Sequence, residues 1–252
     1  MEDDKKQETP GLGKMIALVV VGLVAGYFIG ASASRQSVTT DDSLPSSVEL
    51  QFVNHLQAEL PEQDVFILSG DNSGQVVRID VGQDSDEVKQ MQAYSTLGIT
   101  EHDPFKLGSD PLGPYPIGND LGFTIGDWLS AAGSGKYSVD AETATLAASF
   151  ENLVPEGVYT VWCSRLKFPP SPAVIDTPCG AIDGSENVFT ADAEGRASNE
   201  LSFPPLMQST ESEAQVFALA YHSDGKTYGY MPGDFGSSTH VQIFAMLPPK
   251  GE

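Results

Sequence analysis

The sequence predicts a mainly β protein, in which an antiparallel β-sandwich over residues 134–252 follows an α+β part over residues 44–133 and one N-terminal transmembrane helix. Three observations support this prediction. Short apolar runs separated by turn residues recur after residue 137, as they do in β-sandwiches. The run at residues 143–150 alternates apolar and polar side chains, which indicates a half-buried strand. Residues 15–29 carry no charge and are almost all apolar, as in a membrane-spanning helix.

The composition describes an acidic protein with enough apolar residues for a sizeable core. The chain has 252 residues, of which 40% are hydrophobic. Asp and Glu number 35 against 13 Lys and Arg, which gives a formal net charge of −22. The acidic residues are scattered along the chain. Because nucleic acids and anionic lipids carry phosphates that need Lys and Arg, we expect no nucleic-acid partner.

The apolar segment at residues 15–33 is predicted to be an uncleaved signal-anchor. Three lysines precede it, whereas only Arg35 follows it closely. Lys and Arg accumulate on the cytoplasmic side of a membrane helix. This rule places residues 1–14 in the cytoplasm as a short tail and residues 34–43 outside as a linker. The chain is thus expected to be a single-pass membrane protein with an extracytoplasmic C-terminal part.

The end of the same segment leaves one alternative. Ala31, Ser32 and Ala33 fit the A-x-A pattern of a signal-peptide cleavage site, which would give a cleaved, secreted form. The acidic residues before the segment and its length favour the uncleaved anchor. Both interpretations export the same domain.

Three glycines in the predicted anchor recur every four residues: Gly22, Gly26 and Gly30. Small residues at this spacing form a flat helix face that allows two backbones to approach closely. The spacing therefore predicts a homodimer through this face, while the alternative is that glycine is simply common in membrane helices.

Helices and strands are expected to mix in residues 44–133. Ser46 and Glu49 form the pattern of a capping box at the start of a helix that ends before Pro61. The other elements expected here are strands at residues 64–69 and 75–81 and a helix at residues 85–97.

A stretch rich in Pro and Gly follows at residues 102–120. Because Pro and Gly disfavour both helices and central strands, we expect an ordered loop there. Thr124 and Asp127 then have the spacing of a cap for a short helix over residues 125–132.

Strand patterns dominate the rest of the chain. Residues 187–192 and 196–203 are predicted to be strands joined by a hairpin turn at 193–195. Residues 214–222 are apolar on both faces, which predicts a central strand covered on both sides. Alternating apolar residues at 241–247 predict the last strand.

One short motif precedes these strands and follows the alternating run at residues 143–150. Leu153, Pro155, Gly157 and Tyr159 form an L-x-P-x-G-x-Y run. This run resembles the tyrosine corner of immunoglobulin-like and fibronectin type III sandwiches, in which the Tyr hydroxyl bonds back to the upstream backbone. The resemblance implies an immunoglobulin-like architecture and nothing about function.

The only two cysteines, Cys163 and Cys179, are predicted to form a disulfide. Export places them in an oxidising compartment, where an isolated pair is normally bonded. Neither has a histidine within several residues, which disfavours the alternative of a blue-copper ligand set.

A loop flanked by histidines is the strongest candidate for a functional site. His222 and His240 stand at the two ends of a loop rich in Gly, Asp and aromatic residues. If the flanking runs pair as antiparallel strands, the two imidazoles come close together. With a carboxylate from Asp224 or Asp234, they would suit Zn or Cu. The alternative is that each histidine only bonds to a neighbour within the fold.

Two other chemistries have weaker patterns. Serines and a threonine lie in the same loop, but none stands in a recognisable nucleophile motif. Asp71 with Asn72, and Asp183 with Glu186, could offer oxygens to Ca²⁺, although neither pair matches the EF-hand pattern, and turn formation explains both.

The sequence thus favours a non-enzymatic role, with no catalytic residues and no required cofactor. We expect a membrane-anchored, extracytoplasmic binding or structural module of the cell envelope, whose envelope ligand the sequence does not name. The alternative is a metal-binding or redox protein that uses His222 and His240.

Overall fold

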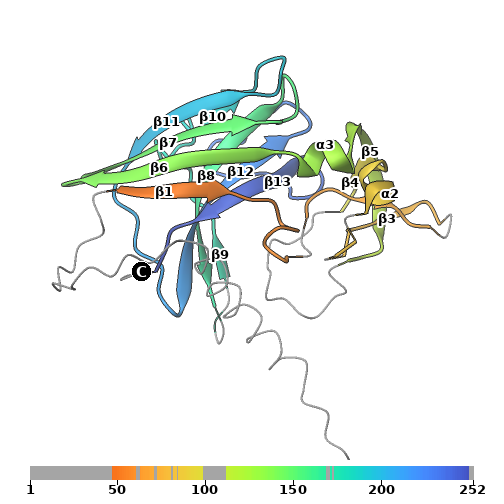
Figure 1. The fold of residues 1–252 in the computed structure, drawn as a ribbon, viewed down its shortest axis with the longest axis horizontal. Coiled ribbons are helices and arrows are strands. Elements are labelled where there is room, and N and C mark those ends of the chain that lie inside the picture. The colour runs from red at the N-terminus through yellow and green to blue at the C-terminus, as the bar shows by residue number, and fades with distance from the viewer. Residues whose placement is uncertain are drawn as a thin grey trace, which may run out of the picture. The chain divides into compact units, whose positions relative to one another are not determined.

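Two antiparallel sheets face each other and share one core (Figure 1). The computed structural model describes residues 47–60, 63–70, 73–80, 82–83, 85–98, 112–168, 171 and 173–249. The prediction of a mainly β protein with antiparallel sheets is confirmed. The predicted anchor, including Gly22, Gly26 and Gly30, lies outside the described residues.

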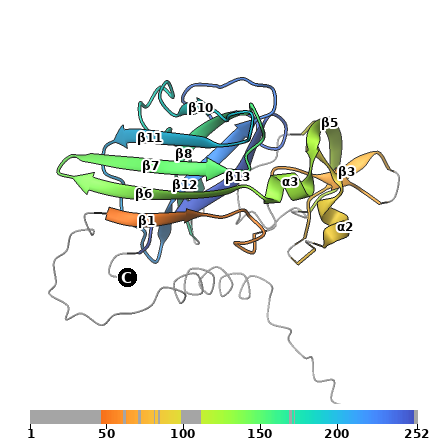
Figure 2. The same ribbon diagram turned by 45° about the horizontal axis from the view of Figure 1, so that its top comes forward.

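Sheet 1 has four strands, and Figure 2 shows them side by side. Their order is β1 (Ser47–Phe52), β6 (Ala132–Asp140), β7 (Thr143–Glu151) and β11 (Ala197–Phe203). The predicted alternation at residues 143–150 is confirmed in β7, where Leu146 and Phe150 are buried while Thr143 and Ala147 are exposed.

Sheet 2 is built around a long central strand. The order is β10 (Val188–Thr190), β8 (Val158–Lys167), β12 (Glu213–His222) and β13 (Thr239–Met246), and β9 (Ala173–Ile175) pairs with the far end of β8. Nine of the ten residues of β12 are buried. The predicted central strand covered on both faces is therefore confirmed.

A third, smaller sheet comes from the middle of the chain. It has the order β2 (Ile67–Leu68), β3 (Gln75–Val77), β5 (Tyr115–Thr124) and β4 (Gln92–Thr96), accompanied by α2 (Asp86–Lys89) and α3 (Ile125–Leu129). The predicted cap of the last helix is confirmed, because Thr124 and Asp127 form a capping box at its start.

The inner faces of sheets 1 and 2 form the main core. Large buried side chains from both sheets belong to one cluster, among them Tyr137, Phe150, Tyr159, Phe217 and Leu219. Burying one such side chain is worth roughly 1.5–3 kcal/mol. Cys163 and Cys179 lie in this cluster and form the predicted disulfide.

Three local predictions are wrong because strand pairing overrides a local signal. Instead of the helix predicted before Pro61, the chain forms β1, since Leu50 and Phe52 alternate with polar residues and pair with β6. The helix predicted at 85–97 is only α2, followed by β4. The ordered loop predicted at 102–120 contains the first half of β5, which pairs with β3 and β4.

The turn at 193–195 also differs from the prediction. It joins β10 and β11, which do not pair with each other: β10 pairs with β8 in sheet 2, and β11 pairs with β7 in sheet 1. The chain changes sheets at this turn, so its residues form a crossover between layers and not a hairpin.

Candidate functional site

The outer face of sheet 2, which points away from sheet 1, carries a second apolar cluster. Trp162, Val216, Ala218, Val241 and Phe244 belong to it and are all buried. The segment that follows β1 covers part of this face, because Ala58 and Leu60 pack against the cluster. Val53 holds this segment at the sheet edge, where it exchanges backbone hydrogen bonds of 2.9 Å with Phe244 of β13. The outer face of the sheet is therefore covered by chain from elsewhere in the sequence.

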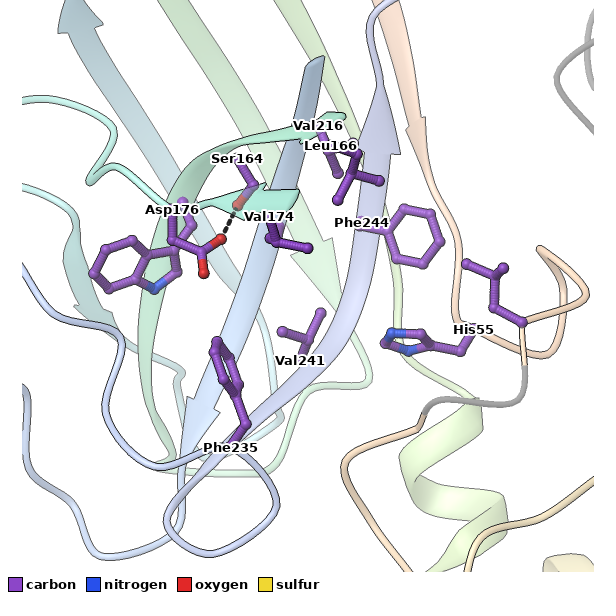
Figure 3. Close-up of a pocket in the computed structure, with 12 residues that line it drawn as sticks. His55, Ser164, Leu166, Val174, Asp176, Val216, Phe235, Val241 and Phe244 are labelled. Carbon is purple, nitrogen blue, oxygen red and sulfur yellow. Dashed lines mark hydrogen bonds between the residues drawn. The ribbon is translucent and has the colours of Figure 1, made fainter. Parts of the chain in front are cut away.

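A pocket of about 70 Å³ remains between these covering segments (Figure 3). Phe235 reaches it from the loop before β13, and Val241 and Phe244 reach it from β13 itself. A water molecule needs roughly 10–15 Å³ by this measure, so the pocket could hold several waters or a group of a few carbon atoms. We call it the outer-face pocket.

Three polar side chains interrupt its apolar wall. Asp176, just after β9, accepts a hydrogen bond of 2.6 Å from the Ser164 hydroxyl. His55 stands on the other side, with its ring edge-on to Phe244 at 5.3 Å between centroids. A carboxylate that still has acceptor capacity, next to apolar walls, suits a ligand with an apolar body and a hydrogen-bond donor.

The two predicted histidines lie on neighbouring strands but on opposite faces of sheet 2. His240 pairs with Tyr221 and His222 pairs with Thr239, so the register is offset by one residue. Since successive side chains of a strand point to opposite faces, one imidazole faces the core and the other faces outward. The predicted strand pairing is confirmed, while the shared position for both imidazoles is not supported by this register.

His240 is fully buried on the inner side. Its Nδ1 lies 2.6 Å from the Asp64 carbonyl oxygen, and its Nε2 lies 2.9 Å from the Ser223 hydroxyl oxygen. The ring also packs near Trp128 and Tyr221. Burial lowers the pKa of His240, although the bond to the Asp64 carbonyl opposes this shift.

His222 is buried on the outer side. Its Nε2 lies 2.8 Å from the Thr160 hydroxyl, which also accepts a 2.7 Å hydrogen bond from the Trp162 indole. Its Nδ1 has no hydrogen-bond partner among the described residues. Burial lowers the pKa of His222 to about 4; the Asp224 carboxylate opposes the shift, and His240 adds to it.

The acidic residues predicted as further ligands are held by their own turns. Asp224 accepts hydrogen bonds from the Tyr228 hydroxyl and the Lys226 N–H. The Asp234 carbonyl accepts from three N–H groups of the same loop. No group of three His, Cys, Asp or Glu side chains that could hold a metal ion occurs in the described part of the chain.

The predicted Ca²⁺ ligands behave in the same way where they are described. Asp183 accepts from the N–H and the hydroxyl of Ser185, and Glu186 accepts from the Ala181 N–H. Asp71 and Asn72 lie outside the described residues.

The motif around Tyr159 forms a buried hydrogen-bonded corner. The Tyr159 hydroxyl accepts a 2.8 Å bond from the Val154 N–H and donates a 2.8 Å bond to Gln242. Gly157 is needed here, since a Cβ would lie only 2.8 Å from the Val154 carbonyl oxygen and 3.0 Å from the Tyr159 ring. Leu153 is buried beside this corner in the main core, and Pro155 lies in the turn between Val154 and Gly157.

Sequence reasoning did not find Asp64, Ser164 or Asp176 as site residues. Asp64 meets His240 across 176 positions of sequence, and no local pattern marks such a contact. Ser223 was noted only as one of several hydroxyl residues in its loop.

Comparison with known proteins gives no relative for this chain. No protein-family model, curated protein or solved structure matches it. Within the part of the chain that the structure describes, no helix is long and apolar enough to span a membrane.

Proposed function

We propose that the chain is a membrane-anchored, extracytoplasmic binding module of the cell envelope, and that its ligand binds in the outer-face pocket. The observation that carries this proposal is the pocket itself, in which apolar walls from four strands surround a single carboxylate, Asp176. Concave, mostly apolar sites with a few polar groups are where small ligands bind in proteins.

The chemistry of the pocket favours a small ligand with an apolar body and an amine or hydroxyl. The walls exclude a strongly hydrated ligand, because burying its polar groups without partners is costly. Asp176 only accepts hydrogen bonds when ionised, so it would select a donor. The net charge of −22 adds a preference for cationic over anionic ligands.

The exported location is supported by the sequence and by the disulfide. The apolar residues 15–33 follow three lysines, which favours a helix with a cytoplasmic N-terminus. A bonded Cys163–Cys179 pair is typical of extracytoplasmic proteins. We keep the homodimer through Gly22, Gly26 and Gly30 as part of this proposal.

We also propose an immunoglobulin-like sandwich. Its support is the Tyr159 hydroxyl, which accepts the N–H of Val154 five residues upstream, as the tyrosine corner of those folds does. The two sheets that share the core agree with this architecture.

Saturation-transfer NMR of the full chain with isobutylamine, a small alkyl amine, tests the pocket. Ala218→Leu adds three carbon atoms to the pocket wall and should abolish binding. Asp176→Asn should weaken binding by roughly 10-fold or more, because a hydrogen bond to a charged group is worth about 1.5–3 kcal/mol.

The matched control is Ala147→Leu, which adds the same atoms to the exposed outer face of sheet 1. It should bind like the native chain. Equal binding by Ala218→Leu and Ala147→Leu would show that the pocket is not the site.

The metal-binding alternative has less support, because His240 uses both ring nitrogens within the fold and His222 faces the other way. Elemental analysis of the purified chain tests it directly. Stoichiometric Zn or Cu that is lost in His222→Ala would favour it over the binding module.

A further inference from the structure

The surroundings of His240 fix which of its nitrogens carries the proton. A carbonyl oxygen can only accept a hydrogen bond, so the Nδ1 that lies 2.6 Å from the Asp64 carbonyl must be the donor. In the neutral imidazole the other nitrogen, Nε2, then carries a lone pair. The Ser223 hydroxyl, 2.9 Å away, is then the donor to Nε2. The Ser238 carbonyl oxygen is a second acceptor for the same proton, but at 3.4 Å it is the longer contact.

Several contacts hold the imidazole in this orientation. Asp64 is fully buried, and its carboxylate accepts a 2.9 Å hydrogen bond from the Val241 N–H, next to His240 in sequence. Trp128 and Tyr221 pack near the ring with centroid distances of 6.3 and 6.0 Å. Asp64 thus acts as a positioning residue for the base through its main chain.

Ser223, which bonds to His240, is more exposed than the histidine. Ser223 is half-buried and begins the loop that joins β12 to β13. A hydroxyl that donates to a buried, oriented imidazole while remaining reachable has the geometry of a nucleophile paired with a general base.

We propose that Ser223 is a nucleophile activated by His240, with the Asp64 carbonyl as the third member, and that this site accepts acyl groups from small carboxylic esters. None of these three residues lines the outer-face pocket, so the proposal does not rest on ligand binding there.

The reaction balances with water as the only co-reactant. Ser223 Oγ forms a bond to the ester carbonyl carbon while its proton moves to His240 Nε2. The C–O bond to the alcohol breaks, and the leaving oxygen takes that proton. Water then attacks the acylated Ser223, gives one proton to Nε2, and releases the carboxylic acid as the proton returns to Ser223.

The acidic surroundings restrict which esters would react. Asp224 follows the serine directly and is exposed, and the whole chain carries a net charge of −22. Uncharged or cationic acyl donors would approach Ser223 more readily than anionic ones.

Labelling of the folded full chain with an uncharged fluorophosphonate tests the proposal. In this reaction Ser223 Oγ bonds to phosphorus, fluoride leaves, and the proton passes to His240. We expect one phosphonyl adduct per chain, mapped to Ser223 by mass spectrometry. The adduct should be absent in Ser223→Ala and in the urea-denatured chain.

The control variant is Ser237→Ala, which removes a hydroxyl from the same loop. The Ser237 hydroxyl makes no described contact with the imidazole. This variant should be labelled at the native rate. Equal labelling of the native and denatured chains, labelling that survives Ser223→Ala, or no labelling of the folded chain would overturn the proposal and leave Ser223 as a structural partner of His240.

A second measurement separates a reactive serine from a merely exposed one. His240→Asn should lower the labelling rate, and the hydrolysis rate of p-nitrophenyl butyrate, by about 100-fold or more, the usual contribution of a general base. Circular dichroism shows whether this variant is folded. If it is not folded, the comparison of native with denatured chain decides, because activation by His240 exists only in the fold.

Discussion

The outer faces of the two main sheets are built from different residues. On sheet 1, Ser134, Ser149 and Ser198 lie side by side across three strands and are exposed. On sheet 2, Trp162 and Phe244 occupy the outer face and are buried. A two-layer sandwich needs only one apolar face on each sheet. The packing of sheet 1 on sheet 2 therefore does not explain why the outer face of sheet 2 is apolar.

The difference between the two outer faces coincides with the position of the segments that lie outside the two sheets. The segment after β1 and the loop before β13 cover the outer face of sheet 2, and the pocket lies between them. The outer face of sheet 1 has no such cover within the described residues. The comparison predicts that substitutions on the two outer faces have unequal effects.

The largest effect is expected for Trp162→Ala. It removes a buried indole from the outer face of sheet 2 and should lower the free energy of unfolding by about 3–5 kcal/mol. Thr145→Ala on the outer face of sheet 1 should lower it by less than about 1 kcal/mol. Chemical denaturation of both variants measures the difference. Similar losses would mean that the outer face of sheet 2 contributes no more than a solvated one.

A smaller effect is expected for Tyr159→Phe, which changes the inner face of sheet 2. The hydroxyl has two partners, so its loss leaves the Val154 N–H and the side-chain oxygen of Gln242 without these hydrogen bonds. We expect a loss of about 1–3 kcal/mol.

The matched control for this variant is Tyr230→Phe, where the side chain is exposed. Its unfolding free energy should change by less than about 0.5 kcal/mol. An equal, small change in both variants would show that the Tyr159 corner adds nothing to the fold.

The sequence predicted the elements whose signal is local. The alternation at residues 143–150 and the cap at Thr124 depend on spacings of two to three residues, and both were confirmed. The prediction of the disulfide came from the expected export and from the presence of only two cysteines, and the bond is present. Each of these signals can be read from a short stretch of the sequence or from the number of cysteines.

The elements that were predicted wrongly depend on distant partners. The residues after Ser46 fit a helical spacing as well as an alternating one, and only pairing with β6 decides between the two. The turn residues at 193–195 have the sequence signal of a hairpin, but the strands on either side of them pair in different sheets. The contact between Asp64 and His240 links residues 176 positions apart, and no spacing rule encodes it.

The most selective test of the outer face of sheet 2 is the pH dependence of stability through His222. The pKa of His222 is about 4 in the folded chain and 6.5 in the unfolded chain. Between these two pH values the unfolded chain therefore binds the proton more readily than the folded chain does. This contribution to stability is complete above about pH 6.5 and is lost as the pH falls towards 4. The loss cannot exceed about 1.4 kcal/mol per pH unit for one histidine.

Denaturation at several pH values should show this slope in the native chain and a flatter one in His222→Gln. Part of the slope should remain, because burial also lowers the pKa of His240 on the inner face. Thr145→Ala, on the outer face of sheet 1, should keep the native slope, because it removes no titrating group. If His222→Gln keeps the full native slope as well, the imidazole is not buried as described, and the outer face of sheet 2 is more open to water than its apolar side chains indicate.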